Sequence, residues 1–352
     1  MSERVNRQWR LARRPVGLVS ATDFTWSEAP LPAVADGQVL VKTLYLSVDP
    51  TQRGWMAGDT YLPAIAIGDV IRSLGVGQVV ESRHEQFAAG QLVQGLLGWQ
   101  DYLCSDGRGE VTLSRLPSGV DATQIPLVMG VLGPTGITAY FGLLEVGRPV
   151  AGETVVVSGA AGATGSVVGQ IAKIKGCRVI GIAGGPEKCA WLTKEAGFDA
   201  AIDYKTEKVD RRLSELCPKG IDVFFDNVGG EILDAALANL AMRGRVVICG
   251  AIAMYNEKAP PPGPRNYLSL LVKRGRMEGF IVIDYMKRAG EAVAALSQWV
   301  HEGRIKHEED VQTGLENAPA TLLRLFDGRN RGKQLLKVAD PPLAVVAQAP
   351  ES

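Results

Sequence analysis

Histidine and cysteine are scarce in this chain of 352 residues, which limits the metal chemistry that the sequence can support. There are three histidines, His84, His301 and His307, and five scattered cysteines with no C-x-x-C pair. Zinc in proteins prefers thiolate and imidazole ligands in a tetrahedral array. Cys104 is the only cysteine before residue 177, and no four-cysteine cluster is present. We therefore expect no metal site and no zinc-alkoxide chemistry.

Net charge is lacking as well, because Lys+Arg and Asp+Glu both number 38. A basic excess is typical of proteins that bind nucleic acid or anionic membranes, so we expect neither partner. We also expect no signal peptide and no membrane-spanning segment, since we find no uninterrupted apolar run of that length. An odd number of scattered cysteines indicates reduced thiols and a cytoplasmic protein.

The stretch Thr154–Lys173 (TVVVSGAAGATGSVVGQIAK) has the pattern of a strand, a glycine turn and a helix. The valines Val155–Val157 suit a strand buried on both faces of a parallel sheet, and apolar residues recur at helical spacing from Val167. Gly162 and Gly165 allow a sharp turn and a close approach to a pyrophosphate at the helix N-terminus. An A-x-G-x-x-G pattern alone is weak, since such turns also serve packing. Between a strand and a helix it predicts a dinucleotide site.

The cofactor predicted for this turn is NADP rather than NAD. An NAD site usually has an acid about twenty residues beyond the glycines, on the ribose 2′-hydroxyl. Here the second strand ends in Ala183-Gly184-Gly185, and Lys188 follows at the start of the next helix. A lysine favours a 2′-phosphate, which a carboxylate would repel, and Tyr204 could add a hydroxyl. The alternatives are an ordinary exposed lysine and a half-buried tyrosine at a strand end.

Two patterns divide the chain. Residues 1 to about 125 hold short strand candidates separated by Gly and Pro, whereas strands alternate with helices from about 127 to 300, which predicts a doubly wound parallel sheet. Lys333–Val338 returns to strand character and could rejoin the first sheet. The main strand candidates are Val39–Leu46, Gly75–Val80, Gln91–Gly95, Cys177–Ala183, Ala200–Ile202, Val223–Asp226 and Arg245–Cys249.

Motifs spread over nearly the whole length carry a family resemblance. They are SVDP at Ser47–Pro50, GWQDY at Gly98–Tyr102, GITAYFGL at Gly136–Leu143, the glycine turn at Ser158–Lys173, DNVGG at Asp226–Gly230, YN…PPGP at Tyr255–Pro264, GLENAP at Gly314–Pro319 and GRNRGKQLLKV at Gly328–Val338. With them the chain resembles the zinc-independent medium-chain dehydrogenase/reductases. The branch is that of leukotriene B4 12-hydroxydehydrogenase/prostaglandin reductase, which includes curcumin reductase-like and alkenal double-bond reductase-like proteins.

The resemblance implies an α/β protein with a GroES-like β-rich catalytic domain plus a doubly wound Rossmann domain with a parallel sheet. Residues 1–126 are expected to form the first part of the GroES-like domain, and residues 127–300 the Rossmann NADP-binding domain. Residues 301–339 would return to the catalytic domain, and residues 340–352 would form a loose tail. The resemblance also implies a homodimer.

The activity implied by the resemblance is NADPH-dependent reduction of the C=C bond of α,β-unsaturated ketones and aldehydes, by hydride transfer to the β-carbon of a small-molecule substrate. The matched positions are Gly162, Ala163, Thr164 and Gly165 in the pyrophosphate turn, Lys188 and Tyr204 at the 2′-phosphate, Asn227 on the nicotinamide side, Asn330 at the cofactor and Tyr255 on the loop facing the enone. Two departures stand out: many relatives have Tyr-Met-Arg where this chain has Thr51, Gln52 and Arg53, and Thr164 replaces a common valine.

The proposed chemistry asks for orientation and for a hydrogen-bond donor at the substrate carbonyl oxygen. Tyr255 is the leading donor, with packing of its loop as the alternative, and Tyr61 could line the substrate site or could pack without contacting substrate. Two other functions stay open. A quinone also offers conjugated carbonyls to a hydride, so a quinone reductase fits the same cofactor, and a catalytically idle NADP-binding scaffold is the second alternative.

Overall fold

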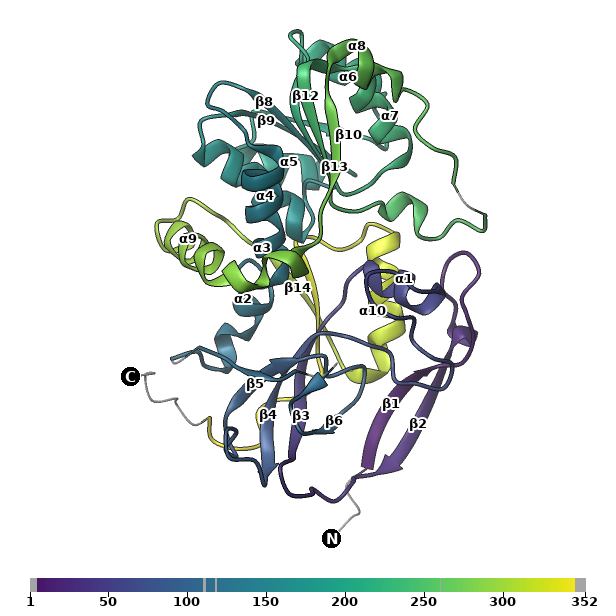
Figure 1. The fold of residues 1–352 in the computed structure, drawn as a ribbon, viewed down its shortest axis with the longest axis vertical. Coiled ribbons are helices and arrows are strands. Elements are labelled where there is room, and N and C mark those ends of the chain that lie inside the picture. The colour runs from purple at the N-terminus through teal and green to yellow at the C-terminus, as the bar shows by residue number, and fades with distance from the viewer. Residues whose placement is uncertain (1–4, 110–111, 118, 260, 346–352) are drawn as a thin grey trace. The chain divides into compact units, whose positions relative to one another are not determined.

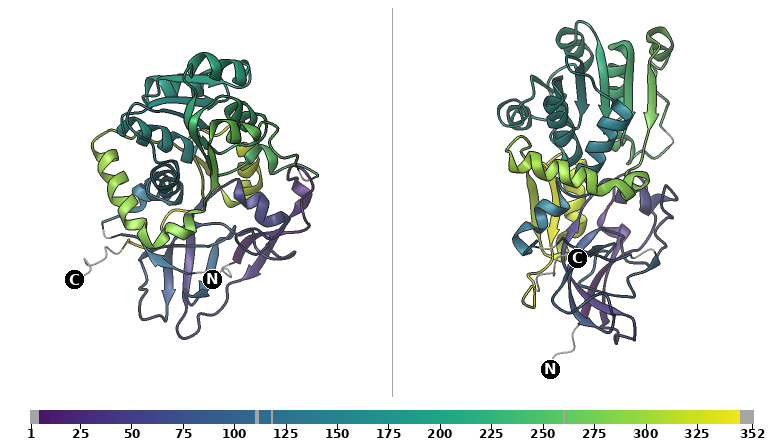
Figure 2. Two further views of the ribbon diagram at one scale, coloured as in Figure 1. Left: turned by 45° about the horizontal axis from the view of Figure 1, so that its top comes forward. Right: turned by 60° about the vertical axis from the view of Figure 1, so that its left-hand side comes forward.

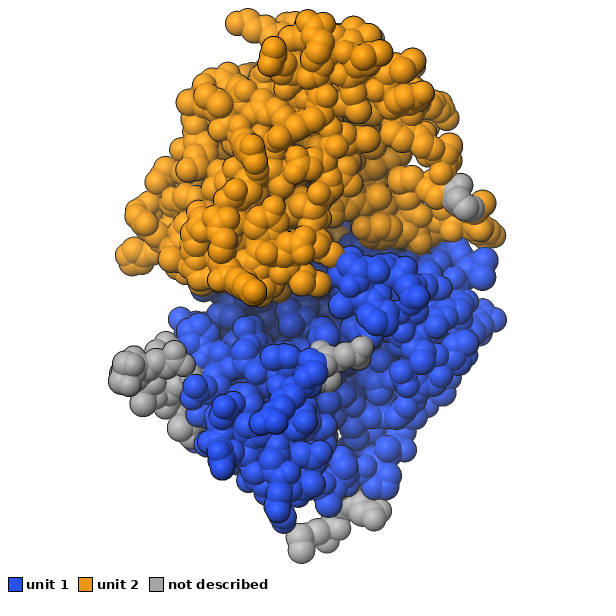
Figure 3. Space-filling view, in the orientation of Figure 1, with its two compact units in different colours: residues 1–129, 310–329, 334–352 blue, residues 130–309, 330–333 orange. Residues whose placement is uncertain are grey.

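A computed structural model describes residues 5–109, 112–117, 119–259 and 261–345 (Figure 1). The chain forms two compact units, coloured separately in Figure 3. Unit 1 comprises residues 1–129, 310–329 and 334–352, and unit 2 comprises residues 130–309 and 330–333. The loose tail predicted for residues 340–352 falls partly outside the described residues, which end at residue 345.

Unit 1 is built on a seven-stranded sheet in the order β14-β15-β3-β4-β5-β7, with β6 paired to β3. A separate two-stranded sheet joins β1 and β2 antiparallel. The helices α1, α2 and α10 belong to this unit and are labelled in Figure 1. The element bounds are β1 Val5–Leu11, β2 Phe24–Pro30, β3 Val39–Ser47, α1 Thr51–Ala57, β4 Gly75–Ser82, β5 Leu92–Gly95, β6 Tyr102–Ser105, β7 Ser114–Arg115, α2 Ile125–Met129, β14 Glu309–Thr313, α10 Ala318–Phe326 and β15 Lys333–Lys337.

The last strand closes this sheet from the far end of the chain. β15 pairs antiparallel with β3, so that Leu335 lies opposite Ser47 and Leu336 opposite Leu46. Leu335 and Leu336 are fully buried. This confirms the prediction that the segment Lys333–Val338 rejoins the first sheet.

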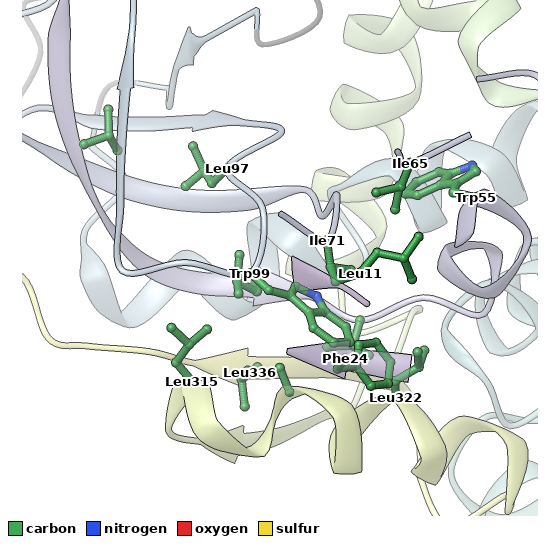
Figure 4. Close-up of a cluster of buried hydrophobic side chains, with 14 of the residues drawn as sticks. Leu11, Phe24, Trp55, Ile65, Ile71, Leu97, Trp99, Leu315, Leu322 and Leu336 are labelled. Carbon is green, nitrogen blue, oxygen red and sulfur yellow. The ribbon is translucent and has the colours of Figure 1, made fainter. Parts of the chain in front are cut away.

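An aromatic and aliphatic core fills unit 1 (Figure 4). Trp99 is fully buried and stacks on Phe24, with ring centroids 5.6 Å apart. Trp9 meets Trp26 edge-on at 5.0 Å. Such offset and edge contacts add to the free energy gained from apolar burial, so the β1–β2 sheet is part of the hydrophobic core.

Unit 2 contains a six-stranded, fully parallel sheet in the order β10-β9-β8-β11-β12-β13. Numbered from β8, this is the order 3-2-1-4-5-6 of a doubly wound sheet. Figure 2 gives two further views of it. The element bounds are α3 Pro134–Phe141, η4 Gly142–Gly147, β8 Thr154–Ser158, α4 Ala163–Ile174, β9 Arg178–Ala183, α5 Pro186–Lys194, β10 Ala200–Asp203, α6 Val209–Leu216, β11 Ile221–Asp226, α7 Gly230–Ala238, β12 Leu240–Ile248, η5 Ile252–Met254, α8 Leu268–Lys273, β13 Arg276–Gly279, η6 Val282–Arg288 and α9 Ala289–His301.

One apolar segment bears on the expectation of no membrane-spanning segment. Residues Ala122–Gly147 form a segment long and apolar enough by length and composition to cross a membrane, and 56% of its hydrophobic window is buried inside the structure. Core helices of soluble proteins pass the same test, and here the segment includes a turn at residues 130–133 between α2 and α3.

Candidate functional site

The glycine turn between β8 and α4 forms the centre of the candidate site. Gly162 stands at the N-cap of α4, and its N–H donates to the Gly159 carbonyl at 3.0 Å. A β-carbon on Gly165 would lie 2.4 Å from that same carbonyl oxygen, so only glycine fits there. The first amides of α4, at Ala163 and Thr164, have no carbonyl one turn earlier in the helix. This turn therefore has the free amides and the close backbone approach that a pyrophosphate group requires.

A second corner of the site lies at the carboxyl ends of β9 and β10. Lys188 belongs to the first turn of α5, which begins at Pro186. The ring of Tyr204 packs against Gly184, where an added β-carbon would lie 2.9 Å from the tyrosine hydroxyl oxygen. Tyr204 is 45% exposed, so its hydroxyl end and the start of α5 lie at one exposed corner.

Asp203 shapes this corner, a role that the sequence analysis missed. Its Oδ1 accepts hydrogen bonds from the N–H groups of Gly185, at 2.8 Å, and Lys205, at 3.1 Å. The bond from Gly185 is the main reason that the pKa of Asp203 is lowered. The carboxylate thus holds the turn that leads into α5, where Gly185 has a φ of 98°.

Asn227 is fixed at the carboxyl end of β11 by contacts with the end of β8. Its side-chain amide donates to the Ser158 carbonyl at 2.7 Å, and its backbone N–H donates to the Ser158 hydroxyl at 2.8 Å. That hydroxyl in turn donates to Asp226 Oδ1 at 2.7 Å. The amides of Val228 and Gly229 donate to the same oxygen at 3.0 Å. Asp226 therefore organises the whole turn after β11, a role that the DNVGG motif did not predict.

Tyr255 lies on the loop after β12, which is bonded to the turn after β11. The N–H of Ile252 donates to the Asn227 carbonyl at 3.2 Å, and the Ala251 N–H donates to the Tyr255 hydroxyl at 3.2 Å. A β-carbon on Gly250 would lie 3.3 Å from this hydroxyl and 3.4 Å from the Asn227 carbonyl oxygen. The structure thus brings Tyr255 and Asn227 together at the carboxyl edge of the sheet.

The segment around Asn330 reaches the glycine turn from the distant end of the chain. Gly332 forms a parallel bridge with Gly162, and its N–H donates to the Ala161 carbonyl at 3.0 Å. The side-chain amide of Asn330 donates to the Gly332 carbonyl at 3.2 Å. Asn330 is therefore two residues from a backbone contact with the turn.

Tyr61 belongs to unit 1 and is described there by itself. Its hydroxyl is 2.9 Å from that of Thr51, and its ring meets Trp55 edge-on. Thr51 stands at one of the positions where the chain departs from the family pattern, and it is this side chain that bonds the Tyr61 hydroxyl. The side chain of Tyr61 is 49% exposed, and its predicted contact with substrate stays a prediction.

Comparison with known proteins identifies the family. Two family models match, one described as the N-terminal domain of oxidoreductases over residues 7–113, the other as zinc-binding dehydrogenases over residues 163–299. The NADPH-dependent curcumin reductase of Escherichia coli is 43% identical, covering 95% of this chain and 97% of its own. Prostaglandin reductase 1 of Bos taurus is 41% identical, covering 94% and 98%. The crystal structure of CurA from Vibrio vulnificus in complex with NADPH is 42% identical with a TM-score of 0.88, covering 95% and 100%.

The chain belongs to the medium-chain dehydrogenase/reductase family. Within it, the chain falls in the zinc-independent reductase branch, together with the curcumin, prostaglandin and 2-alkenal reductases. This confirms the resemblance derived from the motifs. It also confirms the α/β fold class, with a GroES-like sheet and a Rossmann sheet.

The thiols of this medium-chain reductase are poor candidates for nucleophiles. Burial raises the pKa of Cys249, which follows β12, to about 12, and the nearby Asp226 charge adds to the effect. Burial also raises the pKa of Cys104. A thiol must ionise to act as a nucleophile. In the described part of the chain, no group of three or more His, Cys, Asp or Glu side chains could hold a metal ion.

Asp226 leads to a prediction about the pH dependence of stability. Its side chain is 1% exposed, and burial raises its pKa despite three hydrogen-bond donors. A carboxyl group with a raised pKa in the folded state stabilises the fold most below its unfolded pKa of about 3.9. That contribution is lost as the pH rises through the folded pKa. Asn at this position would keep an acceptor oxygen and would not titrate.

We therefore expect the native chain to lose stability relative to Asp226→Asn as the pH rises. The quantity that falls is the free energy of unfolding of the native chain minus that of the variant. Urea unfolding of both proteins over a pH series measures this difference, and other carboxyl groups cancel in it. Asp199→Asn is the opposite control, because hydrogen bonds from Lys173 and Val179 outweigh burial and lower the pKa of Asp199. Parallel curves for the native chain and Asp226→Asn would contradict the raised pKa.

Proposed function

We propose that this chain reduces the C=C bond of α,β-unsaturated ketones and aldehydes with NADPH. The observation that carries the proposal is one cluster at the carboxyl edge of the parallel sheet, comprising the Gly162 turn, Asn227 and Tyr255. Ligands of doubly wound sheets bind at this edge, where the strand order reverses between β8 and β11. The reductases of this branch, including the 2-alkenal reductase of Nicotiana tabacum at 42% identity, support the substrate class.

The cofactor contacts belong to the same proposal. The free amides after Gly162 would hold the pyrophosphate, Lys188 and the Tyr204 hydroxyl the 2′-phosphate, and Asn330 the cofactor beside the glycine turn. A 2′-phosphate suits the exposed corner at Gly184, because a lysine and a hydroxyl supply donors there. NADPH fits this donor set better than NADH does.

The side chains have a limited task in this reaction. Bound NADPH supplies a hydride for the β-carbon of the substrate. Negative charge then develops on the substrate carbonyl oxygen, which becomes an enolate, and a proton must reach the α-carbon. Tyr255 would donate a hydrogen bond to this oxygen or relay the proton. Asn227, held by Ser158, would fix the nicotinamide side of the site.

An assay with two substrate types tests the function. Purified protein is given NADPH with an alkyl enone and, in parallel, with a benzoquinone, and oxidation of NADPH is followed by its absorbance. The proposal expects turnover of the enone to the saturated carbonyl. Turnover of the quinone alone would support the quinone reductase alternative, whereas NADPH binding without oxidation across an enone panel would support the idle scaffold.

The proposal includes a homodimer formed through unit 2. β13 is the edge strand of the parallel sheet, and an unpaired edge is a natural surface for pairing with a second copy. Exposed apolar side chains gather on β13 and on the preceding helix α8: Tyr267, Leu268, Leu271, Val272 and Met277. Exposed apolar side chains that are concentrated on two neighbouring elements in this way are typical of an interface.

A charge placed on this patch should separate the copies. Leu271 is 75% exposed, so Leu271→Glu leaves the core of unit 2 intact and places a carboxylate in the interface. We expect a dimer for the native chain and a monomer for the variant, measured as mass by light scattering. Ile67→Glu, at a 60% exposed residue of unit 1, is the matched control. A dimer in both variants would place the interface elsewhere.

The remaining parts of the proposal concern location and domains. All five cysteines are free, which supports a reducing, cytoplasmic setting without a nucleic-acid or membrane partner. We propose residues 1–126 and 301–339 for the catalytic domain and residues 127–300 for NADP binding, although residues 301–309 and 330–333 belong to the compact unit of the parallel sheet.

A further inference from the structure

A cluster of five arginines marks the edge of unit 2 opposite to the glycine turn. An open depression of about 390 Å³ is lined by Arg148, Arg243, Arg245, Arg274 and Arg276, with Glu153 as its acidic member. Arg245 and Arg276 are partners across β12 and β13, and Arg245 lies in the same row as Val223 and Val155 near the amino end of β8. The proposed reductase chemistry uses none of these residues, although Arg276 lies on β13 and Arg274 ends α8, the two elements of the proposed dimer interface.

The backbone at three of these arginines is unusual. Arg148, Arg243 and Arg274 have φ values of 49°, 62° and 51°, and everywhere else in the described chain a positive φ falls on glycine. Side chains with a β-carbon disfavour this left-handed region. Among the described residues, every other position with a positive φ is a glycine. The three exceptions are arginines, and all three line the same depression.

Helix capping explains only part of this pattern. Arg148 ends η4 and Arg274 ends α8, and a cation is favourable at a helix C-terminus. Glycine is nevertheless the usual residue at such left-handed caps. Arg243 lies inside β12 rather than at a helix end, so capping does not account for it.

The charges in the depression are only partly neutralised. Arg245 binds Glu153 through both terminal nitrogens, at 2.8 and 2.7 Å, which satisfies that carboxylate. Arg276 Nη1 lies 3.6 Å from Glu278 Oε2, at the long end of an ion pair. The side chains of Arg148 and Arg274 each donate one hydrogen bond, to a nearby carbonyl. The side chain of Arg243 has no hydrogen bond or ion pair among the described residues. Like charges at neighbouring positions of paired strands are unfavourable, so the arrangement favours an added anion.

The geometry points to a binding site for a small soluble molecule that carries a phosphate or diphosphate group. Guanidinium groups match phosphate oxygens with paired N–H donors, and Arg148, Arg243 and Arg274 are exposed and have donors to spare. The five arginines gather in one depression on a chain with no net charge, which favours a small anion over a nucleic acid, whose backbone needs an extended basic surface.

Glycine substitutions test the site without threatening the fold. The test variant is Arg148→Gly/Arg243→Gly/Arg274→Gly. Glycine adopts a left-handed backbone without the steric cost of a β-carbon, so the variant should unfold at the same temperature as the native chain or higher. Inorganic pyrophosphate is titrated by calorimetry at fixed ionic strength, with saturating NADPH present to occupy the glycine turn. The native chain should bind it, and each arginine removed should weaken binding roughly tenfold, the loss of one charge-assisted hydrogen bond.

A control variant with the same loss of charge elsewhere completes the experiment. Arg83→Ala/Arg211→Ala/Arg304→Ala removes three exposed arginines outside the depression and should keep the native affinity. The proposed site would be disproved if the triple glycine variant bound pyrophosphate as tightly as the native chain does. It would also be disproved if the native chain did not bind pyrophosphate in the millimolar range. A third result would also disprove the site: the native chain binds no pyrophosphate, and the triple glycine variant becomes monomeric. The arginines would then belong to a contact between copies of the chain. Enone turnover is measured separately, so failure of the reductase proposal leaves this result unaffected.

Discussion

Lys188→Ala should raise the Michaelis constant for NADPH by roughly ten- to a hundredfold, the loss of one or two charge-assisted hydrogen bonds to phosphate. The constant for NADH should change little, because NADH has no 2′-phosphate for the lysine to bind. The reason lies in the corner formed by the start of α5 and the Tyr204 ring on Gly184. Asp203, the nearby acid, is turned toward the backbone amides of Gly185 and Lys205.

Two further variants make this test specific. Tyr204→Phe removes only the hydroxyl and should raise the constant for NADPH less than Lys188→Ala does. Lys194→Ala removes an exposed lysine from the other end of the same helix and should leave both constants unchanged. Initial rates at varied NADPH and NADH concentrations give the Michaelis constants of the native chain and of each variant for both cofactors. Equal effects of Lys188→Ala on both cofactors would remove the phosphate assignment.

The strands of unit 2 could be predicted because their cause is local. The valines Val155–Val157 are fully buried in β8, and buried parallel strands have continuous apolar sequences. β1, Val5–Leu11, gave no such signal, since Asn6 and Gln8 are buried polar residues. Their partner is Gln100, whose Oε1 accepts from both side-chain amides. A partner more than ninety residues away cannot be derived from the periodicity of seven residues.

The candidate site divides in the same way. The glycine turn could be predicted because one short segment contains the strand, the turn and the helix. The support of Asn227 by Ser158 could not, because it joins the ends of two strands 69 residues apart. The bridge from Gly332 to Gly162 is equally invisible to spacing, and Asn330 was found only through the family resemblance. Asp226 was quoted within DNVGG, but its role depends on the burial that the sheet creates.

Tyr255→Phe should lower the turnover number for an enone by about a hundredfold, a typical contribution of one acid–base or oxyanion donor. The affinity for NADPH should stay close to that of the native chain, because the variant keeps the ring that packs in the loop. The Ala251 N–H loses its acceptor at 3.2 Å, a loss that affects stability slightly and not the cofactor contacts. A fall in the turnover number at constant cofactor affinity is what a role in the chemical step predicts.

The control for Tyr255 is a second tyrosine in the same unit. Tyr267 is 57% exposed at the start of α8, so Tyr267→Phe removes a hydroxyl outside the cluster and should leave turnover unchanged. Thermal unfolding of both variants separates a folding defect from a chemical one. The pH dependence of turnover adds a readout that packing alone would not move, since a tyrosine that relays the proton contributes a basic limb that Tyr255→Phe would lack. An unchanged rate for Tyr255→Phe would exclude the hydroxyl from the reaction, and the loop would then serve only to position Asn227.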